Sequence, residues 1–336
     1  MRKVVKLAAL VASAAALTTA MITPASADPP QAVAATDITA VGSDTIEFLG
    51  NNFAALYNAT SPAKKFDSWN ATKPTGTGPN DPAIQPLVIH DSITVKPGVS
   101  IQRSNGSSEG IADLKADTAN PAKIDLARSS RKPQTGDTIG TNPLLFIPVA
   151  EDEVRYALSN AVASHGAPAL TNAQLASIYK CQTTNWNQVG GSAGTIQPKI
   201  PQAGSGTRSF FESQLGITDA DLGACVATVQ EHDPTQIANN ADAVAPFSKA
   251  RSTFPTNLST QIKLNTTGFV GFRPVYLVTR NAGNFSVPTA LQPLLGDGTG
   301  VNGWVCSTAG QNEVTREGFG LLPGHTSSVC GFAEHI

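Results

Sequence analysis

The segment DITAVGSDTIEFLGNNFAALY, residues 37–57, joins an expected strand to an expected helix through a turn of glycine and hydroxyl residues. Ile38, Ala40 and Val41 predict a short strand that ends at Gly42 and Ser43. Apolar residues then recur at spacings of three and four, which indicates an amphipathic helix: Ile46, Leu49, Phe53, Leu56 and Tyr57. The segment therefore predicts one strand–turn–helix unit.

Similar patterns recur along the chain. A strand near Val99–Gln102 precedes a Ser/Gly turn at 104–108 and a helix that carries Ile111 and Leu114. Further strands are expected at Lys123–Ala127, Leu144–Val149 and Val275–Val278, a helix with a capping box at Thr171–Tyr179, and a long surface loop at 59–86. Alternating strands and helices predict an α/β fold with largely parallel sheets.

Composition excludes several classes of protein. Of the 336 residues, 40% are hydrophobic and 14% are charged, so the chain can bury a core and is not globally disordered. A formal net charge of -2 lacks the basic footprint of a general nucleic-acid binder. At roughly 100–200 residues per domain, the length predicts about two domains.

The N-terminus has the pattern of a secretory signal peptide at residues 1–27. Three basic residues, Arg2, Lys3 and Lys6, precede an apolar run at 7–22, and small residues follow at 25–27. A transmembrane anchor is the alternative, but a run of roughly 16 residues is short of the ~20 that span a bilayer. We expect a secreted or extracytoplasmic protein with a linker at 28–36 and no lipid anchor, since no cysteine lies near the cleavage site.

The four cysteines all lie in the part expected to be exported, where an even number favours disulfide bonds. Of the three possible pairings, we favour Cys181–Cys225 with Cys306–Cys330, because each bond would then hold one region of the chain together. A metal site is the alternative, but the sequence has neither a C-x-x-C pattern nor a nearby pair of histidines.

Glycine and hydroxyl residues gather at the starts of three expected helices, at 42–45, 105–110 and 204–208. A helix start offers unpaired N–H groups and a partial positive charge, and serine and threonine add hydroxyl donors. Together they predict an oxyanion site, although an ordinary helix cap explains any one of them alone. Arg128, Arg131 and Arg208 are candidates for the positive charge; Arg128 and Arg131 could equally belong to a solvated loop.

Enzyme patterns are missing from the sequence. It contains no G-x-S-x-G, H-E-x-x-H or P-loop, and its histidines have no metal-ligand spacing. We therefore expect no catalytic residue, no metal and no cofactor.

Several segments, in order, resemble the phosphate-binding subunit of phosphate ABC transporters, a family of periplasmic-type solute-binding proteins. The most specific is LTNAQLASIY at 170–179, followed by TNWN at 184–187. IPVA at 147–150, GSGTR at 204–208 and RPVYL at 273–277 also resemble family motifs. The resemblance covers roughly residues 37–336.

The resemblance implies a two-lobed type II periplasmic-binding-protein fold with two crossover strands and the ligand in the cleft. Lobe 1 would comprise residues 37–147 and 274–336, and lobe 2 residues 148–273. The residues carried over as anion ligands are Thr45, the backbone of Ile46, Ser107, Ser205, the backbone N–H of Gly206, and Thr207.

The chain departs from the family pattern at two positions. Ser130 stands where many members have an aspartate that accepts the proton of phosphate, and Pro201 stands where some have an arginine. Asp44 or Glu109 could supply the missing acceptor, and Arg208 or Arg131 the missing charge.

The sequence thus predicts an exported, monomeric binding protein for inorganic phosphate or a similar tetrahedral oxyanion that feeds an ABC importer and catalyses no reaction. An acceptor for the ligand's proton would make it prefer phosphate to sulfate. The alternatives are an exported phosphatase on the same scaffold and a surface protein that has lost its ligand.

Overall fold

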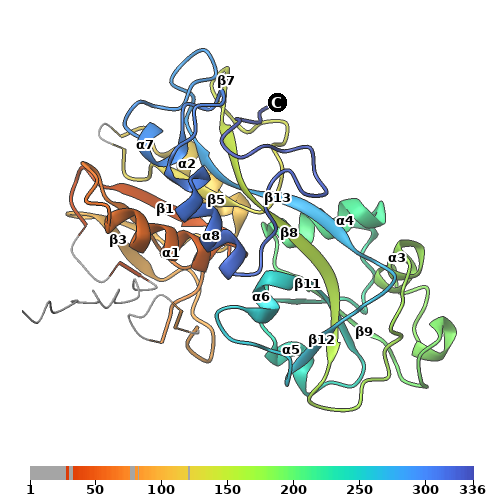
Figure 1. Ribbon diagram of the computed structural model, residues 1–336. Helices are drawn as coiled ribbons and strands as arrows, with labels where there is room; N and C mark the ends of the chain where they lie inside the picture. The colour runs from red at the N-terminus through yellow and green to blue at the C-terminus, as the bar shows by residue number, and fades with distance from the viewer. Residues whose placement is uncertain (1–27, 30–32, 76–79, 82, 120–121) are drawn as a thin grey trace, which may run out of the picture.

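The computed structural model describes residues 28–29, 33–75, 80–81, 83–119 and 122–336 (Figure 1). The expected signal peptide, residues 1–27, lies outside the described residues. Asp28, at the start of the expected linker, pairs with the buried guanidinium of Arg103 at 2.7 Å.

A nine-stranded sheet runs through the whole molecule in the order β10-β9-β11-β8-β13-β5-β1-β2, with β12 paired to β8. Parallel pairing joins β1 to β2 and β5, and β9 to β10 and β11. The strands are β1 (Ile38–Gly42), β2 (Phe66–Ser68), β5 (Leu126–Ser129), β8 (Leu145–Ser159), β9 (Gln197–Pro201), β10 (Ala227–Val229), β11 (Ala243–Ser248), β12 (Ile262–Leu264) and β13 (Gly271–Thr279).

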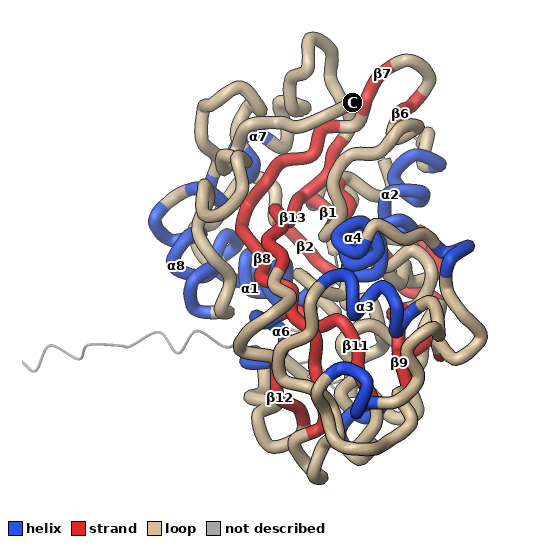
Figure 2. The backbone as a smooth tube through the Cα atoms, turned by 90° about the vertical axis from the view of Figure 1, so that its right-hand side faces the viewer, coloured by secondary structure: helices blue, strands red, loops and turns tan. Residues whose placement is uncertain are grey.

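Strands β8 and β13 are the two crossovers between the lobes. They pair with each other in antiparallel fashion, and Figure 2 shows both continuing from the part that holds β1 and β2 into the part that holds β9 and β11. Along β8, Ala150 packs in one hydrophobic core and Val154 in another. The core thus changes between Ala150 and Val154, on the C-terminal side of the boundary proposed at 147/148; this boundary and the one at 273/274 stay proposals.

Helices cover the sheet in both lobes (Figure 1). Lobe 1 contains α1 (Glu47–Asn58), α2 (Ser107–Ala116), α7 (Gln292–Leu295), α8 (Thr308–Arg316), a 3-10 turn (Trp304–Cys306) and two hairpins, β3 (Ser92–Lys96) with β4 (Val99–Gln102) and β6 (Thr138–Ile139) with β7 (Asn142–Pro143). Lobe 2 contains α3 (Asn172–Tyr179), α4 (Gly206–Leu215), α5 (Thr235–Ala238), α6 (Lys249–Thr253) and two 3-10 turns (Trp186–Val189 and Asp219–Asp221).

The predicted α/β class is confirmed, and the predicted strand–turn–helix at 37–57 corresponds to β1 and α1. The capping box of α3 is also present, with the Thr171 hydroxyl accepting from the Gln174 N–H at 3.2 Å. Three expectations are corrected. The sheets are not largely parallel, because β8 pairs in antiparallel fashion with β11, β12 and β13, and so does β13 with β5. The strand expected at Leu144–Val149 continues to Ser159, and the loop expected at 59–86 contains β2.

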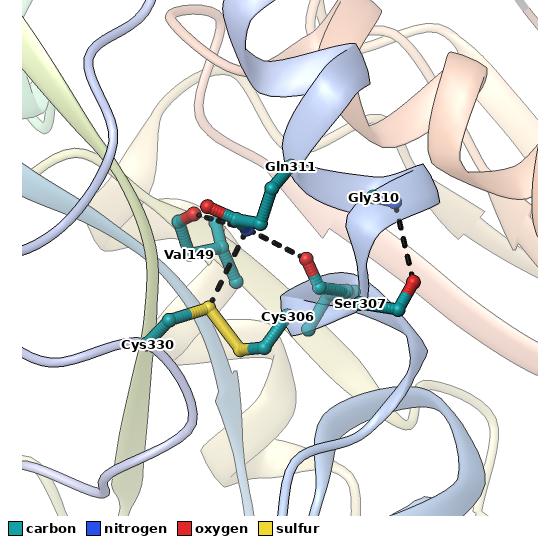
Figure 3. The surroundings of a disulfide bond; sticks show 7 residues. Val149, Cys306, Ser307, Gly310, Gln311 and Cys330 are labelled. Carbon is teal, nitrogen blue, oxygen red and sulfur yellow. Dashed lines mark hydrogen bonds between the residues drawn. A yellow bond between two sulfur atoms is a disulfide. The ribbon is translucent and has the colours of Figure 1, made fainter.

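Both favoured disulfides are present, with Cα–Cα distances of 6.0 Å for Cys181–Cys225 and 5.8 Å for Cys306–Cys330. Around the second bond, the Gln311 amide donates to the Val305 carbonyl at 2.7 Å and lies 3.5 Å from the Cys330 sulfur (Figure 3). Each bond joins residues of a single proposed lobe, so neither crosses the cleft.

Candidate functional site

The three glycine turns predicted from the sequence meet where the lobes face each other. A Cβ on Gly106 would lie 2.9 Å from the carbonyl oxygen of Gly204, and one on Gly206 would lie 2.3 Å from the Ser130 hydroxyl and 2.6 Å from that of Ser107. Side chains at Gly106 and Gly206 would therefore push the lobes apart. Glycine at these positions lets the N-terminus of α4 approach lobe 1 closely.

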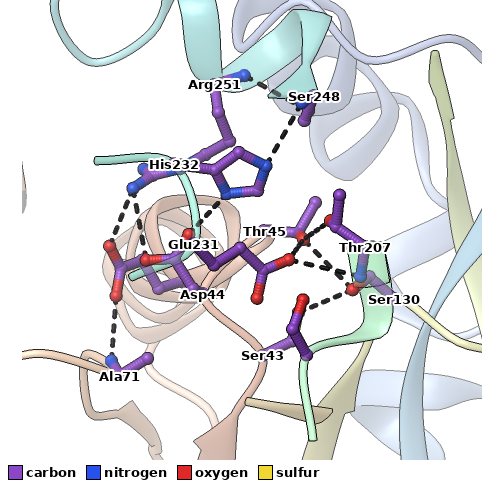
Figure 4. Close-up of polar contacts among 12 residues, drawn as sticks. Ser43, Asp44, Thr45, Ala71, Ser130, Thr207, Glu231, His232, Ser248 and Arg251 are labelled. Atoms are coloured by element: carbon purple, nitrogen blue, oxygen red, sulfur yellow. Dashed lines mark hydrogen bonds and ion pairs between the residues drawn. The ribbon is translucent and has the colours of Figure 1, made fainter. Parts of the chain in front are cut away.

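Hydroxyl groups from both lobes form one buried group at this junction, which we call the hydroxyl cluster: Ser43, Thr45, Ser107, Ser130 and Thr207. Figure 4 shows Ser43, Thr45, Ser130 and Thr207 together. The Thr45 oxygen lies 3.1 Å from that of Ser130 and 3.4 Å from that of Thr207. None of these residues is more than 1% exposed. The structure thus brings together Thr45, Ser107, Ser130 and Thr207, as the sequence predicts.

Arg273, on crossover β13, supplies positive charge to the cluster. It faces Asp152 of β8 in register, and its Nε and Nη2 donate to Asp152 Oδ2 at 3.0 and 2.8 Å. Nη2 also lies 2.7 Å from the Thr207 hydroxyl and 3.3 Å from that of Thr45. Nη1 is buried and has no hydrogen-bond partner within the described residues. In the sequence, Arg273 belongs to the family-like motif RPVYL, which by itself indicates no role for it; an arginine inside an apolar strand was the available signal.

Glu231, two residues after β10, places a carboxylate against the same hydroxyls. Its Oε1 accepts from the Thr45 hydroxyl at 3.1 Å and from the Thr207 N–H at 3.3 Å (Figure 4). Its Oε2 is buried without a partner in the described part of the chain, and the residue is 2% exposed. No pattern around Glu231 in the sequence indicated this position, because the contact depends on how the two lobes meet.

The arginines expected to supply charge bind elsewhere. Arg208 pairs with Glu212 of the same helix, α4, and with Asp219 of the following 3-10 turn. Arg131 pairs with Asp137 at 2.7 Å.

Arg128 is fully buried, and its guanidinium donates to the Gly42 carbonyl at 3.1 Å and the Ser68 hydroxyl at 2.8 Å. Arg128 therefore stabilises the turn that follows β1 by binding a backbone carbonyl at its start. Ser205 caps α4 by accepting from the Arg208 N–H at 3.1 Å, which is the ordinary role of a helix cap.

The two carboxylates expected as acceptors also have other partners. Glu109 accepts from the Asn105 N–H at 2.7 Å and lies 3.0 Å from His90 Nε2. Asp44 Oδ1 lies 2.5 Å from His232 Nδ1. Neither contacts the hydroxyl cluster, whereas Glu231 does.

His232 and Asp44 form a buried contact between the lobes. The Ser248 N–H donates to His232 Nε2 at 3.2 Å, so Nε2 carries no proton and Nδ1 donates to Asp44. Burial lowers the pKa of His232 to about 3 and raises the pKa of Asp44 above its ordinary value. The imidazole is therefore neutral near pH 7.

A second contact between the lobes joins Arg251 to Glu47, with 3.1 Å between Nη2 and Oε1. Burial and the nearby Asp44 raise the pKa of Glu47 to about 7. Beside this contact lies a cavity of about 430 Å³ that both lobes line. Glu231, Asp44 and Arg251 are on its wall.

Chemically, the junction presents hydroxyls, the N-terminus of α4 and a guanidinium, all of which donate hydrogen bonds to an anion. Among the described residues, no group of three or more His, Cys, Asp and Glu side chains is arranged to hold a metal ion. The helices that the structure describes include none with the length and apolar character needed to cross a bilayer.

Comparison with known proteins agrees with this architecture. A phosphate ABC transporter substrate-binding protein of Clostridium perfringens, with bound phosphate, matches with a TM-score of 0.60 and 15% identity over 84% of this chain and 98% of that one. An ABC-type phosphate transport receptor of Vibrio cholerae matches with a TM-score of 0.54 and 20% identity over 85% of this chain and 100% of that one.

These two solved structures are described as transport proteins and share the fold of this chain. None of the curated proteins matches it in sequence. The family model of the PBP superfamily domain matches residues 30–248, which is more than half of the chain. The chain therefore belongs to the PBP superfamily.

Proposed function

We propose that the protein binds phosphate or a similar tetrahedral oxyanion between its lobes, at the hydroxyl cluster. The observation that carries this proposal is the meeting of Thr45 and Ser130 from lobe 1, Thr207 from lobe 2 and Arg273 from a crossover strand at one buried point. Such donors satisfy the several oxygens of a tetrahedral anion at once, and burial strengthens each contact.

The proposed anion ligands are Ser130, Arg273 and the residues carried over from the family resemblance: Thr45, the backbone of Ile46, Ser107, Ser205, the backbone N–H of Gly206, and Thr207. Arg273 takes the place proposed earlier for Arg208 or Arg131, since those side chains pair with carboxylates away from the cluster. Because the cluster is buried, the ligand enters by parting of the lobes about β8 and β13.

The physiological role that we propose is delivery of the anion to an ABC importer by an exported, monomeric protein. The leader-like residues 1–27 and the transport function named for the two similar structures support this role. Titration calorimetry with phosphate, arsenate and sulfate tests it directly. We expect phosphate and arsenate to bind; no heat with any of the three anions would refute the proposal.

Thr207→Ala should weaken phosphate binding roughly ten- to a hundredfold, because it removes one hydroxyl donor to a charged acceptor, worth about 1.5–3 kcal/mol. Thr315→Ala, on the exposed face of α8, is the matched control and should leave the affinity unchanged. Calorimetry measures both. An unchanged affinity for Thr207→Ala would mean that the Thr207 hydroxyl serves only the packing of α4.

A further inference from the structure

Glu231 already holds two donors that the proposed ligand needs. One carboxylate oxygen, Oε1, accepts from the Thr45 hydroxyl of lobe 1 and from the Thr207 N–H at the start of α4 in lobe 2. A carboxylate oxygen and a phosphate oxygen are equivalent acceptors for such groups. We propose that Glu231 is an internal anion that occupies the oxyanion site, and that a ligand binds by displacing it. This inference rests on the proposed function.

Electrostatic repulsion opposes binding of an anionic ligand while the Glu231 carboxylate stays in the site. Arg273, which contacts the Thr45 and Thr207 hydroxyls, is paired with Asp152, so it does not neutralise Glu231 and a ligand together. A second anion beside a buried carboxylate meets repulsion that water barely screens. The Thr45 hydroxyl also has a single proton and donates to one acceptor at a time. The ligand and the Glu231 carboxylate therefore compete for the same donors.

The displaced side chain has space beside it. Glu231 is on the wall of the cavity of about 430 Å³, and Arg251 is on the same wall. Nε and Nη1 of Arg251 have no hydrogen-bond partner in the described structure. A carboxylate that rotates away from Thr45 and Thr207 thus stays near a cation, which lowers the free energy needed to release it.

Glu231→Gln tests the competition, because the amide keeps the shape of the side chain and removes its charge. Asp221→Asn is the matched control: it makes the same change of charge in the same proposed lobe, and Asp221 contacts Thr218 and Lys180 and none of the hydroxyl cluster. Phosphate and sulfate are titrated calorimetrically into the wild type and both variants at pH 7.5. We expect Glu231→Gln to bind both anions at least about tenfold more tightly than the wild type, and Asp221→Asn to stay within about twofold.

Each outcome bears on one of the two proposals. If the wild type binds phosphate and Glu231→Gln does not bind it more tightly, the competition is refuted and the proposed function stands. If Glu231→Gln loses phosphate and gains sulfate, Glu231 instead accepts the ligand's proton, and the competition is again refuted.

If neither the wild type nor Glu231→Gln binds any of phosphate, arsenate and sulfate while both unfold cooperatively on heating, the proposed function itself fails. If Glu231→Gln binds phosphate and the wild type does not, the competition is supported, because Glu231 then excludes the ligand completely. Glu231→Ala provides a second variant should the glutamine variant fold poorly, with the same expected direction for both anions.

Discussion

Arg273→Met should reduce phosphate affinity at least about a hundredfold and lower the free energy of unfolding by about 3–5 kcal/mol. The guanidinium is 1% exposed and contacts Thr45, Thr207 and Asp152 together. Methionine fills a similar volume but leaves the buried Asp152 carboxylate without its cation, which is the costly way to break a buried ion pair. Urea unfolding and calorimetry measure the two effects.

Two further variants separate the effects on stability and binding. Arg273→Met combined with Asp152→Asn removes the unpaired charge, so it should regain part of the stability and none of the anion binding. Lys180→Gln breaks a surface ion pair with Asp221, in which the side chains are 32% and 39% exposed, and should cost at most about 1 kcal/mol. If Arg273→Met binds phosphate as the wild type does, the positive charge of the site lies elsewhere.

Glu47→Gln should change how stability depends on pH. The pKa of Glu47 rises from an ordinary value of 4.5 to about 7, so between these values the folded protein keeps a proton that the unfolded chain has released. Its contribution to stability is therefore lost as the pH rises through this window, at ~1.4 kcal/mol per pH unit. The stability of the wild type relative to Glu47→Gln should fall by roughly 3 kcal/mol from pH 4.5 to pH 7.

His232 acts in the opposite direction, because its pKa falls from 6.5 to about 3. Below pH 6.5 the unfolded chain takes up a proton that the folded protein excludes, so stability is lost as the pH falls. The two slopes oppose each other between pH 4.5 and 6.5, and Glu47→Gln removes one of the carboxyl contributions that oppose the His232 slope. Urea unfolding at several pH values measures both chains. A stability difference that does not vary with pH would show that Glu47 is ionised in the folded protein.

Local patterns in the sequence were enough to place the anion-donating turns. The unit at 37–57 and the turns at 105–110 and 204–208 depend on residues close together in the chain, and the structure brings them to one point. The length of β8 was not predictable in the same way. Its Glu151-Asp152-Glu153 run looks like a surface turn, yet Glu151 and Asp152 are buried because each has a partner elsewhere in the chain.

The charged residues of the site also could not be predicted from the sequence, because their contacts join segments that are far apart in the chain. Arg208 ends the turn at 204–208 and Arg128 and Arg131 flank two serines in sequence, and each binds a backbone or carboxylate group outside the cluster hydroxyls. Arg273 and Glu231 reach the cluster from segments far along the chain. A single sequence shows which side chains can carry charge, and the closing of one lobe on the other decides which of them meet.

The side-by-side placement of the two crossover strands has a mechanical consequence. Two adjacent, hydrogen-bonded connections behave as a single bending ribbon, which favours one axis of rotation and resists twisting of one half against the other. Arg273 and Asp152 face each other on that ribbon, whereas Thr45 and Thr207 are attached to opposite halves. The proposed opening would therefore leave the guanidinium near the axis of rotation, and closing would bring the two hydroxyls back to a charge that has stayed in place.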